Sequence, residues 1–266
     1  MIVIKFGGHA MTDSEGLFAQ AVQSALDLGQ ECVIVHGGGP QINEALTNAG
    51  ISSSFIGGFR VTSEQAFGVV QSVLSGTVLR SVVAQLRSAG INAVGITGRD
   101  GGLLVAQKLT ELVNGAPADL GYVGEVVRVD TSLVTSLLAS GFLPVISPIA
   151  VAGDESDEDS TVGLNVNADL AAGAIAGALG ADSLIIMTDV PGIYRNWPDT
   201  SSLIASITFN ELFLIKDEFA EGMAPKVLAA LNAISSGAQQ VRIIDGKDPQ
   251  AFALALRGLG GTMVTR

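Results

Sequence analysis

Six short apolar runs recur along the chain, and stretches long enough for helices separate most of them. The runs are rich in β-branched residues and are apolar on both faces. Strands of this kind occur in parallel sheets that helices cover on both sides. The expected strands are Ile2–Phe6, Cys32–His36, Ala93–Thr97, Leu143–Ser147, Leu184–Thr188 and Val241–Ile244. The pattern therefore predicts an α/β protein with an open, mainly parallel sheet sandwiched between helices.

Helix-length stretches lie between these runs. The predicted helices are Glu15–Leu28, Gln41–Ala49, Ser63–Ala89, Thr131–Ser140, Ala168–Leu179, Pro225–Ser236 and Pro249–Arg257. Gly102–Gln107 and Val123–Asp130 are typical of antiparallel or edge strands. No Ser/Pro-rich linker divides the chain, so the 266 residues are expected to form a single domain.

The composition narrows the class of protein. The chain has 14 Lys and Arg against 26 Asp and Glu, a net charge of −12, which makes it a poor non-specific binder of nucleic acid. One Cys and two His allow no internal disulfide framework and no structural zinc site. The chain start lacks secretory-signal features, and Gly and Pro interrupt the uncharged run Thr131–Gly153. We expect a soluble cytoplasmic protein that binds neither nucleic acid nor a membrane.

Glycines cluster where the first two predicted strands end. Lys5 precedes Gly7 and Gly8, and the second strand runs into Gly37–Gly39 and Pro40. Backbone N–H groups at a strand-to-helix turn can bind anions, and glycine lets a ligand approach closely. For the first cluster, a tight turn beside a surface lysine is the simpler structural alternative. Ligands of open α/β sheets bind at this edge.

Three enzyme classes with glycine-rich motifs lack support. His36 and the following glycines match an esterase oxyanion-hole motif, but no G-x-S-x-G elbow and no later histidine exist. The dinucleotide fingerprint fails because Ile42 stands where its third glycine belongs. The P-loop pattern fails because Asp248 follows Gly246-Lys247. We expect His36 to be a packed or hydrogen-bonded residue and not a catalyst.

Polar residues in two further segments suit small charged ligands. Arg60 follows a glycine pair, where a guanidinium can bind a carboxylate through two hydrogen bonds, although an exposed arginine at a hairpin tip would look the same. Asn165, Asn167 and Asp169 alternate where a helix is expected to open. Asn167 can be explained as a helix cap alone. Together the three residues can hold a polar ligand and orient cations.

A turn follows the predicted strand Leu184–Thr188. Thr188 and Asp189 precede a Pro-Gly pair and Tyr194, and Pro-Gly favours a turn at the sheet edge. Asp189 at that place suits either binding of a ribose or capping of the turn.

Lys226 stands near the start of a predicted helix. It follows Gly222, Met223 and Pro225, and proline suits the first turn of a helix. A cation there is unfavourable unless an anion is present, so Lys226 indicates a phosphate site.

The order of these motifs is more specific than any one of them. KFGG, HGGGP, GFRVT, NVNAD, TDVPG and GMAPK follow one another as in the amino-acid kinase family. The segment Asp119–Val127 and the ending Gly261–Val264 are also similar to members that act on N-acetyl-L-glutamate. The resemblance covers essentially the whole chain.

The resemblance implies an activity and a fold. The activity is transfer of the γ-phosphoryl group of ATP to the side-chain carboxylate of N-acetyl-L-glutamate, in arginine or ornithine biosynthesis. The fold is the three-layer, carbamate kinase-like arrangement, with the amino-acid site in about 1–165 and ATP in about 166–266. A carboxylate is already a nucleophile, so positioning and electrostatic stabilisation carry such a reaction. Mg²⁺ would be held mainly by ATP, without a dedicated cluster of protein ligands.

The resemblance also implies residue roles. The residues implied to be catalytic are Lys5, Lys226 and Asp169. Those implied to bind phosphoryl oxygens through backbone N–H groups are Gly7, Gly8 and Gly38. Those implied to bind the acetylated amino acid are Gly38, Gly39, Arg60, Asn165 and Asn167. Those implied to border the nucleotide are Thr188, Asp189, Tyr194, Gly222 and Met223.

Two other interpretations stay open. A related kinase could act on glutamate or aminoadipate linked to an acidic carrier protein, although the net charge of −12 argues against a basic rim for that partner. A non-catalytic amino-acid sensor could keep the fold, although both lysines and Asp169 argue for catalysis. Members of the resembled family that arginine inhibits carry an extra N-terminal helix, whereas the first strand here is expected to begin at Ile2. The resemblance therefore implies a homodimer that arginine does not inhibit. The block Asp154–Ser160 is expected to be an acidic loop.

Overall fold

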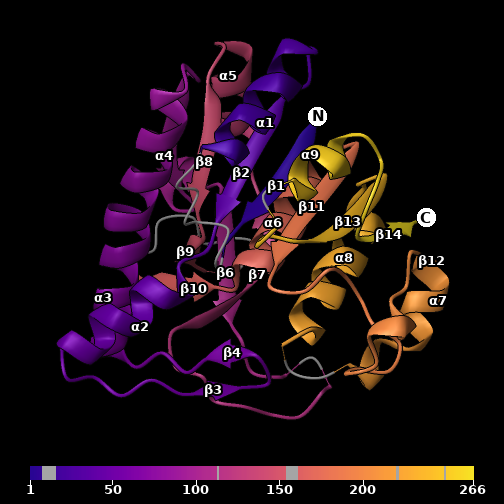
Figure 1. Cartoon of the computed structure of the whole chain (residues 1–266). Helices are drawn as coiled ribbons and strands as arrows, with labels where there is room; N and C mark the ends of the chain where they lie inside the picture. Colours follow the sequence, from indigo (N-terminus) through magenta and orange to yellow (C-terminus); the bar gives the residue numbers. More distant parts are fainter. Residues whose placement is uncertain (8–15, 113, 154–160, 220–221, 249) are drawn as a thin grey trace.

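A large sheet runs through the computed structural model, which describes residues 1–7, 16–112, 114–153, 161–219, 222–248 and 250–266. Its strands are β1 (Ile2–Phe6), β2 (Cys32–His36), β5 (Ala93–Thr97), β8 (Leu143–Ser147), β11 (Ser183–Thr188), β12 (Ser206–Thr208), β13 (Gln240–Asp245) and β14 (Thr262–Thr265). They are ordered β12-β14-β13-β11-β1-β2-β8-β5 (Figure 1). Six strands are parallel, and β14 and β12 run in the opposite direction at one edge. The six predicted strands are these six, each within one residue at either end.

The predicted helices are also present, within one or two residues at each end. The helices are α1 (Leu17–Asp27), α2 (Gly39–Asn48), α3 (Glu64–Ser72), α4 (Leu79–Ser88), α5 (Ser132–Ala139), α6 (Ala168–Ala178), α7 (Phe209–Leu214), α8 (Ala224–Ser236) and α9 (Ala251–Leu256). The short α7 was not predicted. The 3₁₀ turns η3 (Asp100–Gly102), η4 (Thr200–Ser202) and η5 (Lys216–Glu218) join neighbouring elements.

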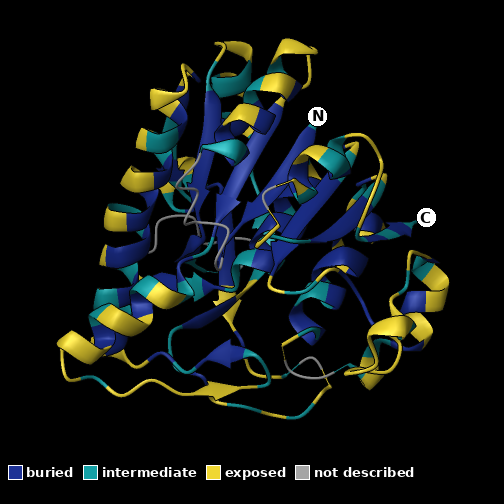
Figure 2. Cartoon of the chain, viewed as in Figure 1, coloured by how far each residue is buried: buried dark blue, intermediate teal, exposed yellow. Residues whose placement is uncertain are grey.

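Different helices cover the two faces of the sheet. Ile2, Ile4 and Phe6 of β1 pack in a core with residues of α1, α2, α3, α4 and α9. Val3 packs in a second core with residues of α5, α6, α7 and α8. Both cores are dark blue in Figure 2. The predicted three layers are therefore confirmed. Because side chains alternate along a strand, Lys5 lies on the Val3 face, beneath α6 and α8.

A closed four-stranded barrel stands beside the large sheet. Its strands are β6 (Leu104–Lys108), β7 (Val123–Val129), β9 (Ile149–Ala152) and β10 (Gly163–Val166). The two stretches predicted as antiparallel or edge strands are β6 and β7, which pair antiparallel. The helix was predicted to begin at Ala168, as it does, but the strand just before it was not predicted. Gly163–Val166 form this strand, β10. The hairpin of β3 (Phe55–Ile56) and β4 (Phe59–Arg60) lies below this barrel in Figure 1.

The predicted helix Ser63–Ala89 contains a π-helical stretch, η2 (Val73–Val78), between α3 and α4. A Cβ built on Gly38 would lie 2.8 Å from Leu74 Cδ2 and 3.2 Å from Val78 Cγ2, both in η2. Glycine at position 38 therefore allows the long helix to pack on the glycine-rich loop. By length and composition, Glu64–Ser88 would also suit a membrane span, which is weak evidence because core helices share these properties.

Helices α6 and α8 pack with their backbones in close contact. A Cβ on Gly173 of α6 would lie 2.6 Å from the carbonyl oxygen of Ala229 in α8. One turn further along α6, a Cβ on Gly177 would lie 2.5 Å from Cβ of Ser236. Real Cβ atoms do not approach so closely, so both positions require glycine at this spacing of the helices.

Candidate active site

The carboxyl ends of β1, β2 and β11 meet at one edge of the large sheet. The strand order reverses between β1 and β11, and ligands of open α/β sheets bind at such a switch point. Two cavities lie here. The first, of about 380 Å³, is lined by Lys5, the Gly37–Gly39 loop, the β3–β4 hairpin and the start of α6. The second, of about 700 Å³, is lined by residues that follow β11 and by residues before α8. Asp189 and Lys226 line both cavities.

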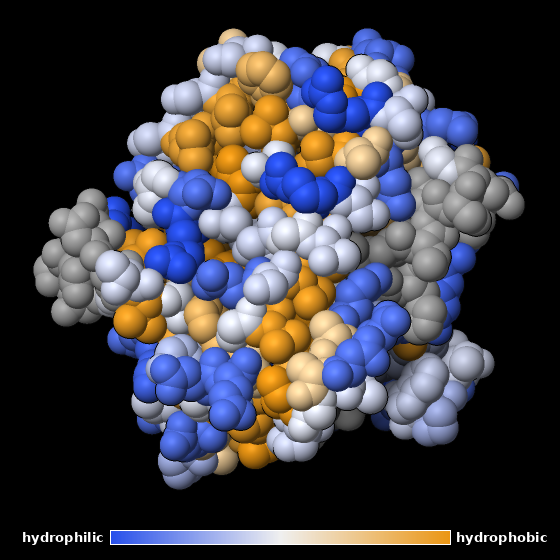
Figure 3. Space-filling view, turned by 90° about the vertical axis from the view of Figure 1, so that its left-hand side faces the viewer, coloured by the Kyte–Doolittle hydropathy of each residue, from blue (hydrophilic) through white to orange (hydrophobic). Residues whose placement is uncertain are grey.

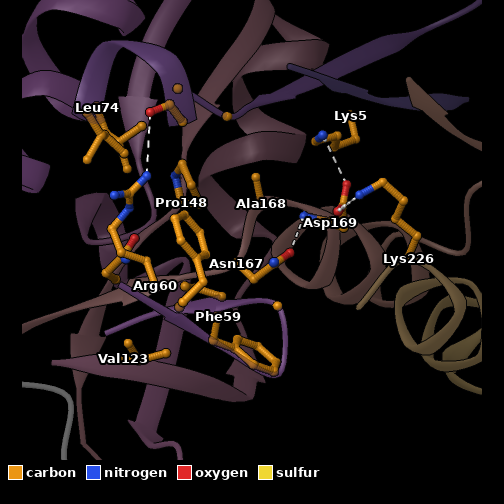
Figure 4. Close-up of a pocket in the computed structure, with 18 of the residues that line it drawn as sticks. Lys5, Phe59, Arg60, Leu74, Val123, Pro148, Asn167, Ala168, Asp169 and Lys226 are labelled. Carbon is orange, nitrogen blue, oxygen red and sulfur yellow. Dashed lines mark hydrogen bonds and ion pairs between the residues drawn. The ribbon is translucent and has the colours of Figure 1, made fainter. Parts of the chain in front are cut away.

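Two lysines from distant parts of the chain share one carboxylate. Lys5 Nζ lies 3.1 Å from Asp169 Oδ1, and Lys226 Nζ lies 3.2 Å from Asp169 Oδ2. Lys5 also donates to the carbonyl of Met187, and Lys226 to the carbonyl of Gly222. Figure 4 shows both ammonium groups converging on Asp169. The structure thus brings together the three residues predicted to be catalytic.

Asp169 is buried and stays charged because of these lysines. Burial alone would raise the pKa of its carboxyl group. The charges of Lys5 and Lys226 and their hydrogen bonds outweigh burial, so the pKa lies below the ordinary 3.8. The side chain of Asn167 accepts hydrogen bonds from the backbone N–H groups of Asp169 and Leu170 and caps α6. The carboxylate is therefore fixed by the helix start as well as by its two cations.

Three helices begin at the first cavity. Gly38 and Gly39 stand at the start of α2, Asn167 caps α6, and Lys226 lies in the first turn of α8. The positive ends of these helix dipoles favour an anion. A Cβ on Gly7 would lie 3.0 Å from Nζ of Lys5, so a side chain at position 7 would crowd the ammonium group. Gly8, also predicted to bind phosphoryl oxygens, lies outside the described residues.

Arg60 lies across the first cavity from the two lysines (Figure 4). It is buried, with 7% of its surface exposed, so the alternative of an exposed arginine at a hairpin tip is wrong. The guanidinium donates to the hydroxyl of Ser53 and, at 3.4 Å, to the carbonyl of Gly39. It also lies 4.6 Å from the centre of the Phe55 ring. Burial lowers its pKa, but a guanidinium stays charged at neutral pH.

The two asparagines predicted to bind the amino acid also line the first cavity. Asn165, in β10, donates from Nδ2 to the hydroxyl of Thr62 at 3.4 Å. Asn167 uses its side-chain oxygen to cap α6. Sequence reasoning missed the apolar lining of this cavity. Leu74, Val123 and Pro148 also line it, and none of the three belongs to one of the six motifs.

The second cavity contains all five residues predicted to border the nucleotide. Thr188, Asp189, Tyr194, Gly222 and Met223 line it. Sequence reasoning missed Arg195, Asn196, Trp197, Glu218 and Phe219, which line it too. For Trp197 a signal was present, because it is the chain's single tryptophan and follows Tyr194 closely.

His36 is fully buried at the end of β2, as a packed histidine was predicted to be. Its Nδ1 lies 2.8 Å from the carbonyl oxygen of Gly37. Its Nε2 has no hydrogen-bond partner among the described residues. Burial lowers the pKa of His36 to about 4; the Gly37 contact opposes the shift and the charge of Arg80 adds to it.

We expect acid to destabilise the protein through His36. The unfolded chain takes up this proton below about pH 6.5 and the folded protein only near pH 4. Stability present above pH 6.5 is therefore lost as the pH falls toward 4, by roughly 2 kcal/mol at pH 5. Urea unfolding at pH 7.5 and 5.0 measures the loss. In His36→Asn the free energy of unfolding should depend less on pH. An equal loss between pH 7.5 and 5.0 in the parent and the variant would contradict the assignment to His36.

Comparisons with known proteins agree with this arrangement. The amino acid kinase family matches over residues 1–245. An acetylglutamate kinase of Arthrobacter sp. (strain FB24) is 48% identical over 257 residues, 95% of this chain and 82% of that protein. The crystal structure of smu.665 from Streptococcus mutans UA159 has a TM-score of 0.79 at 29% identity, covering 99% of this chain and 98% of that one. Carbamate kinase from Giardia lamblia bound to AMP-PNP has a TM-score of 0.67 at 20% identity, covering 100% and 98%, and shares the fold.

The sheet, the paired lysines on one buried aspartate and the family match over residues 1–245 agree with one another. The chain belongs to the amino acid kinase family.

Proposed function

We propose that this protein transfers the γ-phosphoryl group of ATP to the side-chain carboxylate of N-acetyl-L-glutamate. The observation that carries the proposal is the pair Lys5 and Lys226, held on Asp169 where two cavities meet. The 48% identity to an acetylglutamate kinase selects this substrate over glutamate or aminoadipate on a carrier protein. Both lysines and Asp169 are in place, which favours an enzyme over a non-catalytic sensor.

In the proposed reaction a carboxylate oxygen forms a bond to the γ-phosphorus. The bond from that phosphorus to the bridging oxygen breaks, and ADP leaves with the electron pair. No proton has to be removed from the nucleophile, so no general base is required. The charge on the transferred group spreads over its three other oxygens, where ammonium groups and backbone N–H donors stabilise it most.

The residues of the first cavity divide the work. Arg60 and Asn165 would bind the α-carboxylate and the acetamido group of the substrate. Gly38, Gly39 and Asn167 would complete this binding site. The side-chain carboxylate would then point across the cavity toward Lys5 and Lys226. Gly7, Gly8 and Gly38 would donate backbone N–H groups to phosphoryl oxygens. Asp169 would hold both ammonium groups in position.

The second cavity would hold the nucleotide, bordered by Thr188, Asp189, Tyr194, Gly222 and Met223. Its connection to the first cavity at Asp189 and Lys226 would place the γ-phosphate beside the amino acid. Mg²⁺ requires few protein ligands when phosphates bind it, and Asp189 offers a carboxylate where the two cavities meet. The ion would neutralise phosphate charge. In this proposal about 1–165 binds the amino acid and about 166–266 binds ATP.

The direct test is ADP release with Mg-ATP and four acceptors: N-acetyl-L-glutamate, glutamate, aspartate and N-acetyl-aminoadipate. We expect turnover with N-acetyl-L-glutamate alone. Turnover that required a carrier-linked acceptor would favour the carrier-dependent kinase. Binding of ATP without turnover on any acceptor would favour the sensor.

Arg60→Lys should raise KM for N-acetyl-L-glutamate by about 10- to 100-fold, because lysine keeps the charge but loses the two-pronged hydrogen bond to a carboxylate. KM for ATP should stay within about twofold, since Arg60 lines only the first cavity. Initial rates over both substrates measure the two constants. An equal rise in both would contradict a role confined to the amino acid.

We also propose that the protein is a soluble, cytoplasmic homodimer that binds no nucleic acid. Apolar side chains gather on the face that α3 and α4 present to the viewer in Figure 3, which supports a second copy as partner. Light scattering should give twice the chain mass, and we expect no inhibition by arginine.

A further inference from the structure

We infer that the indole of Trp197 forms the stacking wall for the nucleobase in the second cavity. This inference rests on the proposed function, because it takes that cavity as the nucleotide site. Trp197 lines the cavity, yet 64% of its surface is exposed. A flat ligand stacked on this large apolar side chain would remove its exposed surface from water.

The end of the second cavity that holds the phosphates determines where the base would lie relative to Trp197. The second cavity shares Asp189 and Lys226 with the first, so the phosphate chain belongs at that end. The ribose and base must extend toward the remaining lining. That lining consists of residues from Tyr194 to Trp197, together with Glu218, Phe219 and Met223.

Tyr194 fixes the indole without covering it. The two ring centres lie 5.2 Å apart with an angle of 62° between the planes, an edge-to-face contact. Tyr194 itself is buried, with 9% of its surface exposed. A single edge-to-face contact occupies at most one face of the indole. Among the described residues no second ring packs on the indole, so its other face can stack on a base, while the buried tyrosine limits rotation of the ring.

The size of the effect follows from known stacking energies. Removing an aromatic side chain that stacks on a base costs about 1–3 kcal/mol. Trp197→Ala should therefore raise KM for ATP by about tenfold and leave KM for N-acetyl-L-glutamate within about twofold. Trp197→Phe keeps an aromatic face and should recover most of the loss. Phe213→Ala is the matched control, because Phe213 is half exposed but lines neither cavity.

A binding measurement tests the inference without turnover. Trp197 is the chain's one tryptophan, so its fluorescence reports this position alone. ADP should quench or shift the emission, whereas tripolyphosphate, which lacks a base, should leave it unchanged. Emission that ADP does not alter, or that tripolyphosphate alters equally, would overturn the inference. So would a KM for ATP in Trp197→Ala within twofold of the parent value.

The two proposals fail separately. An ADP-specific change in emission without turnover on N-acetyl-L-glutamate would support Trp197 as the base wall and reject the proposed acceptor. Normal turnover on N-acetyl-L-glutamate, together with Trp197 emission that ADP does not change, would reject Trp197 as the base wall and support the proposed acceptor.

Discussion

Lys226→Ala is expected to lower kcat by about 10²–10³, the cost of removing one preorganised stabiliser of transition-state charge. Lys226 lines both cavities and lies 3.2 Å from the carboxylate that positions it. Lys5→Ala should have an effect of the same size, since Lys5 approaches the same carboxylate from β1. Single-turnover and steady-state rates with saturating substrates measure both losses.

The control for these variants is Lys108→Ala, which removes an exposed lysine of β6 outside both cavities. It changes the net charge equally and should keep full turnover. Lys226→Arg preserves the charge but replaces a point charge with a planar group, so it should recover only part of the rate. Near-normal turnover in Lys226→Ala would rule out its role in phosphoryl transfer.

Asp169→Asn is expected to damage both stability and catalysis. The substitution leaves two ammonium groups, each with less than a fifth of its side chain exposed, without their shared counter-ion. Removing one partner from a buried ion pair costs about 3 kcal/mol or more. The lysines should also lose their positions, so we expect kcat to fall by at least about 10².

The pH dependence separates this electrostatic effect from loss of packing. The pKa of Asp169 is depressed in the folded protein, so its contribution to stability is present above about pH 3.8 and is lost as the pH falls through the lower, folded-state pKa. The stability difference between the parent and Asp169→Asn should thus be full at pH 7 and shrink in strong acid. Urea unfolding across this range measures it, with Asp27→Asn, a change at an exposed helix end, as the control. A difference that did not depend on pH would assign the loss to packing.

The large sheet was predictable because its central strands are buried on both faces. Continuous apolar runs such as Val3 with its neighbours leave little ambiguity about period or length. The barrel was only partly predictable. Gly163–Val166 is short and interrupted by Asn165, and the strand depends on pairing with β7 and β9 from other parts of the chain. Local sequence carries little of that information.

The candidate site shows the same division. The motifs predicted Lys5, Asp169 and Lys226 as site residues. Asp169 stands 164 positions from Lys5 and 57 from Lys226 in the sequence, so their contacts could be seen only in the fold. The burial of Arg60 could not be predicted, because a glycine turn beside an arginine is also the pattern of an exposed hairpin tip. Trp197 lies outside all six motifs, and its place in the cavity depends on its contact with Tyr194.

The close packing of α6 on α8 extends the set of residues on which turnover depends. Asp169 belongs to α6 and Lys226 to α8. The distance between the two helix axes therefore sets the distance between the carboxylate and the ammonium group. Gly177 lies roughly 12 Å along the helix from Asp169 and lines neither cavity. A methyl group added there would still wedge the helices apart and draw Lys226 away from its partner. Surveys of random variants should accordingly find inactive yet folded proteins at glycines remote from every ligand.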